Sequence, residues 1–176
     1  MKPDGIWGNI FRYGPRKEPL AEVLQNIPVF QDLSPKELRI LEGVVHLRTY
    51  QPGETVFAET EPGAGMYVIR YGRVDVILKY QSENELILAE LEEGDFFGEM
   101  ALLGDGSRSA TAVAREKSEL IGFFHPDLLE ILELHPVMGA KITLGLAKTL
   151  ADRLRYTNMQ VRDVWEIRGP NEAVTG

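Results

Sequence analysis

The feature that most constrains the fold is a row of short β-rich runs between His46 and Phe124, separated by turns that contain glycine. Within Val74–Leu78, apolar residues alternate with other residues, which is typical of a half-buried strand. Short strands at regular spacing predict a β-sandwich or a small barrel such as a jelly roll. The runs are Thr55–Phe57, Met66–Ile69, Val74–Leu78, Leu86–Leu88, Ala110–Val113 and Leu120–Phe124.

Two short helices are predicted before this β-rich region. The second has a compact start, because Ser34 can cap the helix, Pro35 suits its first turn, and Glu37 can reach back to the cap amide. The segment 1–19 is rich in proline and glycine and is expected to form an irregular arm. The first helix is indicated by apolar residues spaced along one face, which are Leu20, Val23, Leu24 and Ile27.

Behind the β-rich region the apolar period becomes helical again. A short helix is expected to open at His125, and a longer one at His135-Pro136 that Gly169-Pro170 would stop. The domain is taken to span residues 20–165, with 166–176 as a flexible tail. The fold class is therefore mainly β, a jelly-roll (double-stranded β-helix) barrel with N-terminal helices and a long C-terminal helix. Every fourth position of that long helix is apolar, at Ile142, Leu146, Leu150 and Leu154.

Composition and charge exclude several classes of function. The 176 residues carry a formal net charge of −8, which suits DNA phosphates poorly, so DNA is not an expected partner. Without cysteine there is no disulfide or thiolate metal site, and His46, His125 and His135 form no close pair, which argues against a cupin-type metalloenzyme. The apolar runs are too short to span a bilayer and the N-terminus lacks the features of a signal peptide, so a cytoplasmic location is expected.

The stretch from Phe97 to Ala112 is the best candidate for a binding site. Gly98 lets the backbone approach a ligand, and residues 99–103 can form one helical turn whose free amides face an anion. Arg108 follows a glycine-rich turn and can return to the same place, where its fork of donors suits a phosphate. Glu99 only accepts hydrogen bonds, so it suits a ligand hydroxyl. A ribose 2′-hydroxyl beside a cyclic phosphate supplies both groups.

These residues resemble the phosphate-binding cassette of the cyclic-nucleotide-binding domain family. The family pattern is close to F-G-E-[LIM]-A-L, a short spacer and R-[AST]-A-[TS], and the spacing from Glu99 to Arg108 fits that of protein kinase A regulatory subunits without a gap. The resemblance extends over residues 27–155. Its other parts are Pro52-Gly53-Glu54, Met66–Ile69 followed by Gly72 and Val74, and Gly94–Gly98.

The resemblance implies a sensor that binds cAMP or cGMP, uses no cofactor and is not an enzyme. Arg108 would bind the exocyclic phosphate oxygens and Glu99 the ribose 2′-hydroxyl, while the backbone amides of Ala101 and Ser109 complete the phosphate site. Ser109 does not decide the base, because a hydroxyl there is common in cGMP sites and bacterial cAMP receptors also carry Arg-Ser-Ala. The expected binding residues are Gly98, Glu99, Met100, Ala101, Arg108, Ser109, Ala110 and Arg153.

Several alternatives stand beside these roles. Glu99 and Arg108 would, in the simplest alternative, form a surface ion pair without function. Arg153 on the long helix resembles a purine-contacting arginine of hyperpolarisation-activated channels, or else is a solvated residue paired with an acid. Tyr156 and Trp165 could stack on a base, although packing is favoured for Trp165. The alternative function is an interaction module of the same fold that binds no nucleotide.

The output is expected to leave through the long C-terminal helix. After Trp165 the sequence given is too short for a helix-turn-helix, so a DNA-reading element is not expected. The apolar stripe of the helix needs a partner surface, which is the barrel, a second copy of the chain or an effector protein. Ligand would attract the helix through Arg153 and close it as a lid.

Overall fold

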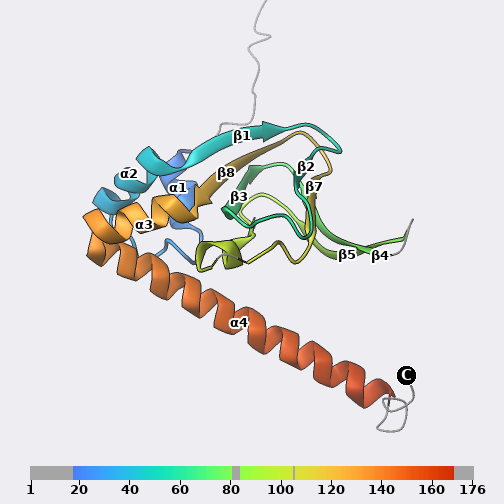
Figure 1. Ribbon diagram of the computed structural model, residues 1–176. Coiled ribbons are helices and arrows are strands. Elements are labelled where there is room, and N and C mark those ends of the chain that lie inside the picture. The colour runs from blue at the N-terminus through green and yellow to red at the C-terminus, as the bar shows by residue number, and fades with distance from the viewer. Residues whose placement is uncertain (1–17, 81–83, 105, 169–176) are drawn as a thin grey trace, which may run out of the picture.

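The computed structural model describes residues 18–80, 84–104 and 106–168. Two four-stranded antiparallel sheets form the jelly-roll barrel, in the strand orders β1-β8-β3-β6 and β2-β7-β4-β5 (Figure 1). The chain passes repeatedly from one sheet to the other, so the predicted double-stranded β-helix is confirmed. The strands are β1 (His46–Tyr50), β2 (Thr55–Phe57), β3 (Gly65–Tyr71), β4 (Val74–Tyr80), β5 (Asn84–Leu91), β6 (Phe96–Phe97), β7 (Thr111–Ala114) and β8 (Ser118–Phe124).

Helices precede and follow the strands in the sequence, and they meet at one end of the barrel. Figure 1 shows α1, α2 and α3 gathered there, with α4 leaving from the same end and running past the strands. A short 3-10 helix, η2, lies between β6 and β7 in the chain. The bounds are α1 (Leu20–Gln25), α2 (Pro35–Val44), η2 (Glu99–Leu102), α3 (His125–Leu134) and α4 (Pro136–Arg168).

The start of α2 and the end of α4 lie where the sequence predicted them. Ser34 Oγ accepts a hydrogen bond from the Glu37 amide at 3.4 Å, and Glu37 Oε2 accepts one from the Ser34 amide at 2.7 Å, which completes the capping box of α2. α4 ends at Arg168, immediately before Gly169-Pro170. Residues 166–168 are therefore helical, whereas 1–17 of the expected arm and 169–176 of the expected tail lie outside the described residues.

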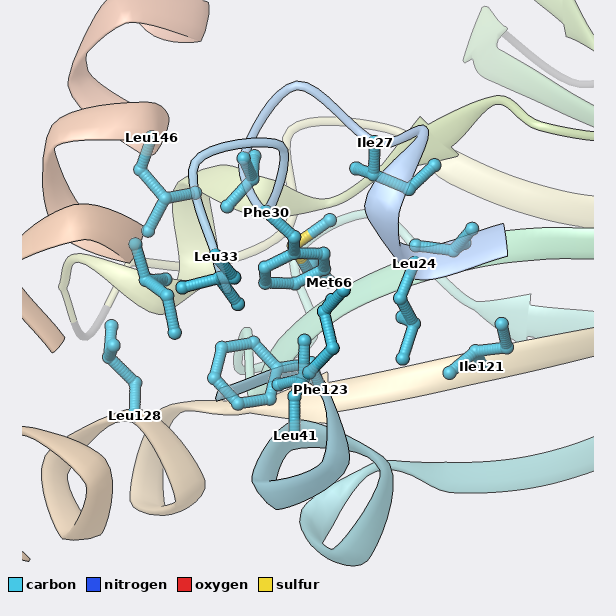
Figure 2. Packing of buried hydrophobic residues seen from close by; sticks show 14 of the residues in the cluster. Leu24, Ile27, Phe30, Leu33, Leu41, Met66, Ile121, Phe123, Leu128 and Leu146 are labelled. Carbon is cyan, nitrogen blue, oxygen red and sulfur yellow. The ribbon is translucent and has the colours of Figure 1, made fainter. Parts of the chain in front are cut away.

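A hydrophobic core joins the helices to one sheet. Figure 2 shows Phe30, Met66 and Phe123 packed together, with Leu128 of α3 and Leu146 of α4 beside them. The rings of Phe30 and Phe123 meet edge to face, with centroids 5.7 Å apart. Because α3 and α4 share this core with β3 and β8, the two helices are held against the barrel.

The apolar stripe of α4 changes its environment along the helix. Ile142 and Leu146 are fully buried, Leu150 is partly buried, and Leu154 is 61% exposed. From position 152 to position 163 every residue of α4 is exposed. The first half of the stripe therefore packs on the body of the domain, and the second half finds no partner within the described chain.

Two strands were not among the predicted runs. In β1 only Tyr50 of the five residues is buried, so the strand has no alternating apolar pattern to read. β6 consists of Phe96 and Phe97 alone and is too short to show a period. Within the described residues, no helix is long and apolar enough to cross a membrane.

Candidate functional site

A pocket of about 660 Å³ lies between the second sheet, η2 and α4. Its size is in the range of pockets that hold small molecules. Phe57, Val76 and Leu91 of the sheet line one side, and Leu150 and Arg153 of α4 line the other. All eight residues predicted for the binding site line this pocket as well, although they come from three separate segments: 98–101, 108–110 and Arg153.

Gly98 sets the close approach of two segments in the pocket. Its φ is +75°, in the left-handed region that favours glycine, and it is the N-cap residue of η2. A Cβ at this position would lie 2.7 Å from Arg108 Nη1 and 3.2 Å from the Gly65 carbonyl oxygen. The glycine is therefore required both for the backbone conformation and for the position of Arg108.

The guanidinium of Arg108 is buried without an acidic partner. Arg108 is 6% exposed, its Nη1 donates to the Gly98 carbonyl at 3.1 Å, and its Cζ lies 3.9 Å from the centroid of the Phe57 ring. Its Nε has no hydrogen-bond partner, and no carboxylate of the described residues lies within ion-pair distance. Burial lowers the pKa of Arg108, against the opposing charges of Tyr67, Glu61 and Glu99. Such a cation is costly unless an anion meets it.

Glu99 pairs with α4 and not with Arg108. Glu99 is 3% exposed, and its Oε2 lies 2.7 Å from Arg153 Nη1. The contact is an ion pair, and Oε2 accepts no hydrogen bond from the described part of the chain. The alternative of a surface pair between Glu99 and Arg108 is wrong, because both groups are buried and they face different partners.

Arg153 is also held by the protein backbone. Its Nη2 donates to the Phe96 carbonyl at 3.0 Å, and its Cζ lies 4.8 Å from the centroid of the Phe96 ring. The alternative of a solvated helix residue paired with an acid is not contradicted, since the side chain is 47% exposed, although the acid that it meets is buried and lies on another element. Its role at the base stays a prediction.

The end of the pocket that is predicted to bind a phosphate is formed by η2 and the residues after Arg108. The Ala101 amide, expected to face the phosphate, donates to the Gly98 carbonyl at 3.2 Å and closes the turn of η2. Ala101 and Ala110 are buried, whereas Ser109 is exposed and Met100 is 64% exposed at the pocket. The contacts of these residues with a ligand stay predictions.

Sequence reasoning missed the apolar wall of the pocket. Phe57, Val76, Ala89 and Leu91 come from three strands, and nothing distinguishes them from other strand residues in the sequence. Tyr156 is 62% exposed and does not line the pocket, so stacking on a base there is not supported. The side chain of Trp165 lies outside the described residues.

The histidines have structural contacts. His125 Nδ1 lies 2.8 Å from the Leu102 carbonyl oxygen, and His46 Nε2 lies 3.6 Å from Asp127. Within the residues that the structure describes, no group of three or more metal-ligating side chains is gathered.

A jelly-roll barrel with a pocket that is lined by a buried arginine, which has no acidic partner among the described residues, is typical of a binding domain for a small anionic ligand. The model of the cyclic nucleotide-binding domain matches residues 47–135, just over half of the 176 residues. The chain therefore belongs to the cyclic nucleotide-binding domain family, and the resemblance of the cassette is confirmed.

Known relatives are similar over most of the chain. It is 33% identical to the cyclic AMP receptor protein of Thermus thermophilus over 138 residues, which is 78% of this chain and 62% of the relative. It is 32% identical to a cAMP-dependent protein kinase regulatory subunit of Colletotrichum orbiculare, over 56% of this chain and 25% of the relative. The crystal structure of Thermus thermophilus catabolite activator protein superimposes with a TM-score of 0.69 and 33% identity, and the match covers 78% of this chain and 62% of that one. The chain thus spans less than two thirds of the length of each of these relatives.

Proposed function

We propose that this chain is a cyclic nucleotide sensor, which binds cAMP or cGMP in the pocket and couples binding to the C-terminal helices. The observation that carries the proposal is Arg108, a buried guanidinium with no acidic partner among the described residues. A planar fork of donors in a pocket of this size suits a singly charged cyclic phosphate. In this view the protein has no catalysis of its own and needs no cofactor.

The lining residues of the pocket support one orientation of the ligand. The cyclic phosphate would meet Arg108 and the backbone of η2, and the ribose 2′-hydroxyl would meet the carboxylate of Glu99. The purine would then lie along the apolar wall of Val76, Leu91 and Leu150. At this end the pocket has few polar side chains, which suits the faces of a purine and leaves the choice between adenine and guanine to few contacts.

η2 connects the pocket to the helices. Glu99 and Ala101 line the pocket, while Leu102, in the same turn, is buried in the core with Leu128 and Ile142. The ring of His125, the first residue of α3, contacts the Leu102 carbonyl. A ligand that shifts η2 therefore shifts the packing of α3 and α4, and Arg153 adds a direct connection from α4 to Glu99.

The exposed half of α4 is proposed to carry the output to a second copy of the chain. Isolated helical segments of this length are marginal in water, so a helix that is exposed from 152 to 163 gains stability from a partner. Leu150, Leu154, Thr157 and Val161 follow the alternating spacing of four and three that forms a coiled-coil seam. An effector protein bound by the same face is the other outcome, and sedimentation equilibrium distinguishes them.

A thermal-shift measurement on nucleotide-free protein tests the proposed ligand. We expect cAMP or cGMP at 100 times its Kd to stabilise the fold by about 2.7 kcal/mol, with linear 5′-AMP giving much less. Arg108→Ala should remove the shift, and Arg115→Ala, which removes an arginine paired with Asp75 outside the pocket, should keep it. If no cyclic nucleotide shifts the thermal transition at millimolar concentration, the alternative function, an interaction module that binds no nucleotide, is favoured.

A further inference from the structure

We infer that Arg153 is a positioning residue, which acts on the ligand through Glu99 and makes the ribose 2′-hydroxyl the group that α4 senses. The inference rests on the proposed cyclic nucleotide binding and deepens it. Its starting point is a contact between two segments that are far apart in the sequence: Glu99 of η2 and Arg153 of α4.

Glu99 needs a cation, and α4 supplies it. A carboxylate that is 3% exposed is costly unless it is paired. Arg153 is the one lysine or arginine of the described residues within ion-pair distance of Glu99. Arg108, the other cation of the pocket, directs its Nη1 to the Gly98 carbonyl and makes no ion pair among these residues. The position of the Glu99 carboxylate therefore depends on a residue of the C-terminal helix.

The guanidinium of Arg153 is held in place by the protein. Nη1 faces Glu99, Nη2 donates to the Phe96 carbonyl, and the Phe96 ring lies under Cζ. Both terminal nitrogens thus have protein partners, although the side chain remains 47% exposed. Each terminal nitrogen carries two N–H groups, so donors remain beyond these contacts. The contact that the protein itself fixes is the one with Glu99, which favours an action through Glu99, and direct reading of the base is the other outcome of the test.

Glu99 can accept a ligand hydroxyl while it keeps Arg153. Each carboxylate oxygen has two acceptor positions, and Oε2 has no hydrogen-bond donor in the described chain. With Arg153 beside Glu99, a hydrogen bond from a hydroxyl to the carboxylate is charge-assisted. Without Arg153, the carboxylate would lose the contact that holds it in place and could rotate away from the hydroxyl.

The coupling works in both directions. A group on α4 that strengthens the bond between Glu99 and the hydroxyl must itself be held more tightly when the hydroxyl is present. A ligand without the 2′-hydroxyl can still bind Arg108 and the apolar wall, but it does not report to α4 by this route. Recognition of the ribose and docking of α4 are then one event.

The test compares cAMP with 2′-deoxy-cAMP by isothermal titration calorimetry. For the wild type we expect cAMP to bind at least about tenfold more tightly, the size of a hydrogen bond to a charged group. Arg153→Ala should reduce the ratio of the two Kd values, 2′-deoxy-cAMP over cAMP, to about threefold or less and leave the Kd of 2′-deoxy-cAMP nearly unchanged. Arg153→Lys should restore most of the ratio, since an ammonium can also pair with Glu99. Arg155→Ala, an exposed arginine of the same helix, is the matched control and should behave as the wild type.

A direct contact with the base, or a purely structural role, gives a different result. In either case Arg153→Ala weakens cAMP and 2′-deoxy-cAMP by the same factor, which overturns the inference while the proposed ligand stands. If the wild type binds no cyclic nucleotide, the proposed function fails first.

A second measurement tests the contact without ligand. Arg153→Ala and Glu99→Gln should each increase amide hydrogen exchange in α4 around Leu150, and the double variant should show no further increase. Additive effects would show that the two residues act independently and would overturn the inference even if the ligand were never found.

Discussion

Lys141 of α4 lies 2.7 Å from Glu37 Oε2 and 3.0 Å from Glu37 Oε1, so one lysine bridges both carboxylate oxygens. Glu37 is at the same time the capping-box residue of α2. The first half of α4 is thus tied to the N-terminal helices by an ion pair as well as by the core around Ile142 and Leu146. The first half of α4 is therefore fixed to the body of the domain, whereas the second half is exposed.

The anchor should make stability depend on pH. Hydrogen bonds from Lys141 and from Ser34 lower the pKa of Glu37 from 4.5 to about 2. A carboxyl whose folded-state pKa is depressed stabilises the fold above pH 4.5, and this stabilisation is lost as the pH falls toward 2. The pair is partly exposed, so we expect about 1 kcal/mol after screening by solvent. Urea unfolding of the wild type and of Lys141→Met between pH 6 and pH 3 measures this contribution. The free energy of unfolding of the variant should fall less in acid than that of the wild type. An equal fall in both proteins would contradict the role of the ion pair.

Gly98→Ala should damage binding more than folding. The new Cβ would lie 2.7 Å from Arg108 Nη1 and would push the guanidinium from its place, in addition to about 1 kcal/mol of backbone strain. Gly94→Ala is the matched control, because Gly94 also has a positive φ, of 88°, but an added Cβ there meets nothing within 4 Å. We expect similar losses of thermal stability in both variants and a loss of cyclic nucleotide affinity in Gly98→Ala alone. Equal affinities would show that Arg108 does not need this position.

The sequence predicted the cassette because its requirements are local. A left-handed glycine, a turn of helix and an arginine after a glycine-rich turn lie within residues 98–108, and the structure places all of them on one pocket. The capping box of α2 was predictable for the same reason. The strand spacing predicted a sandwich or a small barrel such as a jelly roll, and the structure confirmed the jelly roll.

The remaining parts of the site depend on contacts that no local pattern records. Val76 and Ala89 look like ordinary strand residues, and only the pairing of β4 with β5 brings them to the pocket together. The helical period showed which face of α4 is apolar, but it could not show that Arg153 reaches Glu99, 54 positions earlier. Binding by the site residues and the cytoplasmic location stay predictions.

Ser109→Ala should cost cGMP more affinity than cAMP. Ser109 is exposed at the pocket next to Arg108, where its hydroxyl can accept from the 2-amino group that only guanine carries. We expect a loss of about fivefold to tenfold for cGMP, the net value of one hydrogen bond, and less than about twofold for cAMP. Competition binding with both nucleotides measures the difference. Equal losses for the two nucleotides would assign the hydroxyl to the phosphate.

The final prediction concerns the path from the ligand to α4. Ligand binding should raise hydrogen-exchange protection in the cassette and also across residues 140–160 of α4, because η2 and Arg153 connect the two. Protection in α4 should be strongest near Leu150 and Arg153, which line the pocket, and should weaken toward position 160, where the helix is fully exposed. His125→Phe removes the ring nitrogen that contacts the Leu102 carbonyl and keeps an aromatic ring, so it should lower the protection in α4 without lowering that of the cassette. Protection confined to residues 97–112 in the wild type would show that α4 does not respond to the ligand. The output would then have to leave through another surface, and the exposed half of α4 would serve assembly alone.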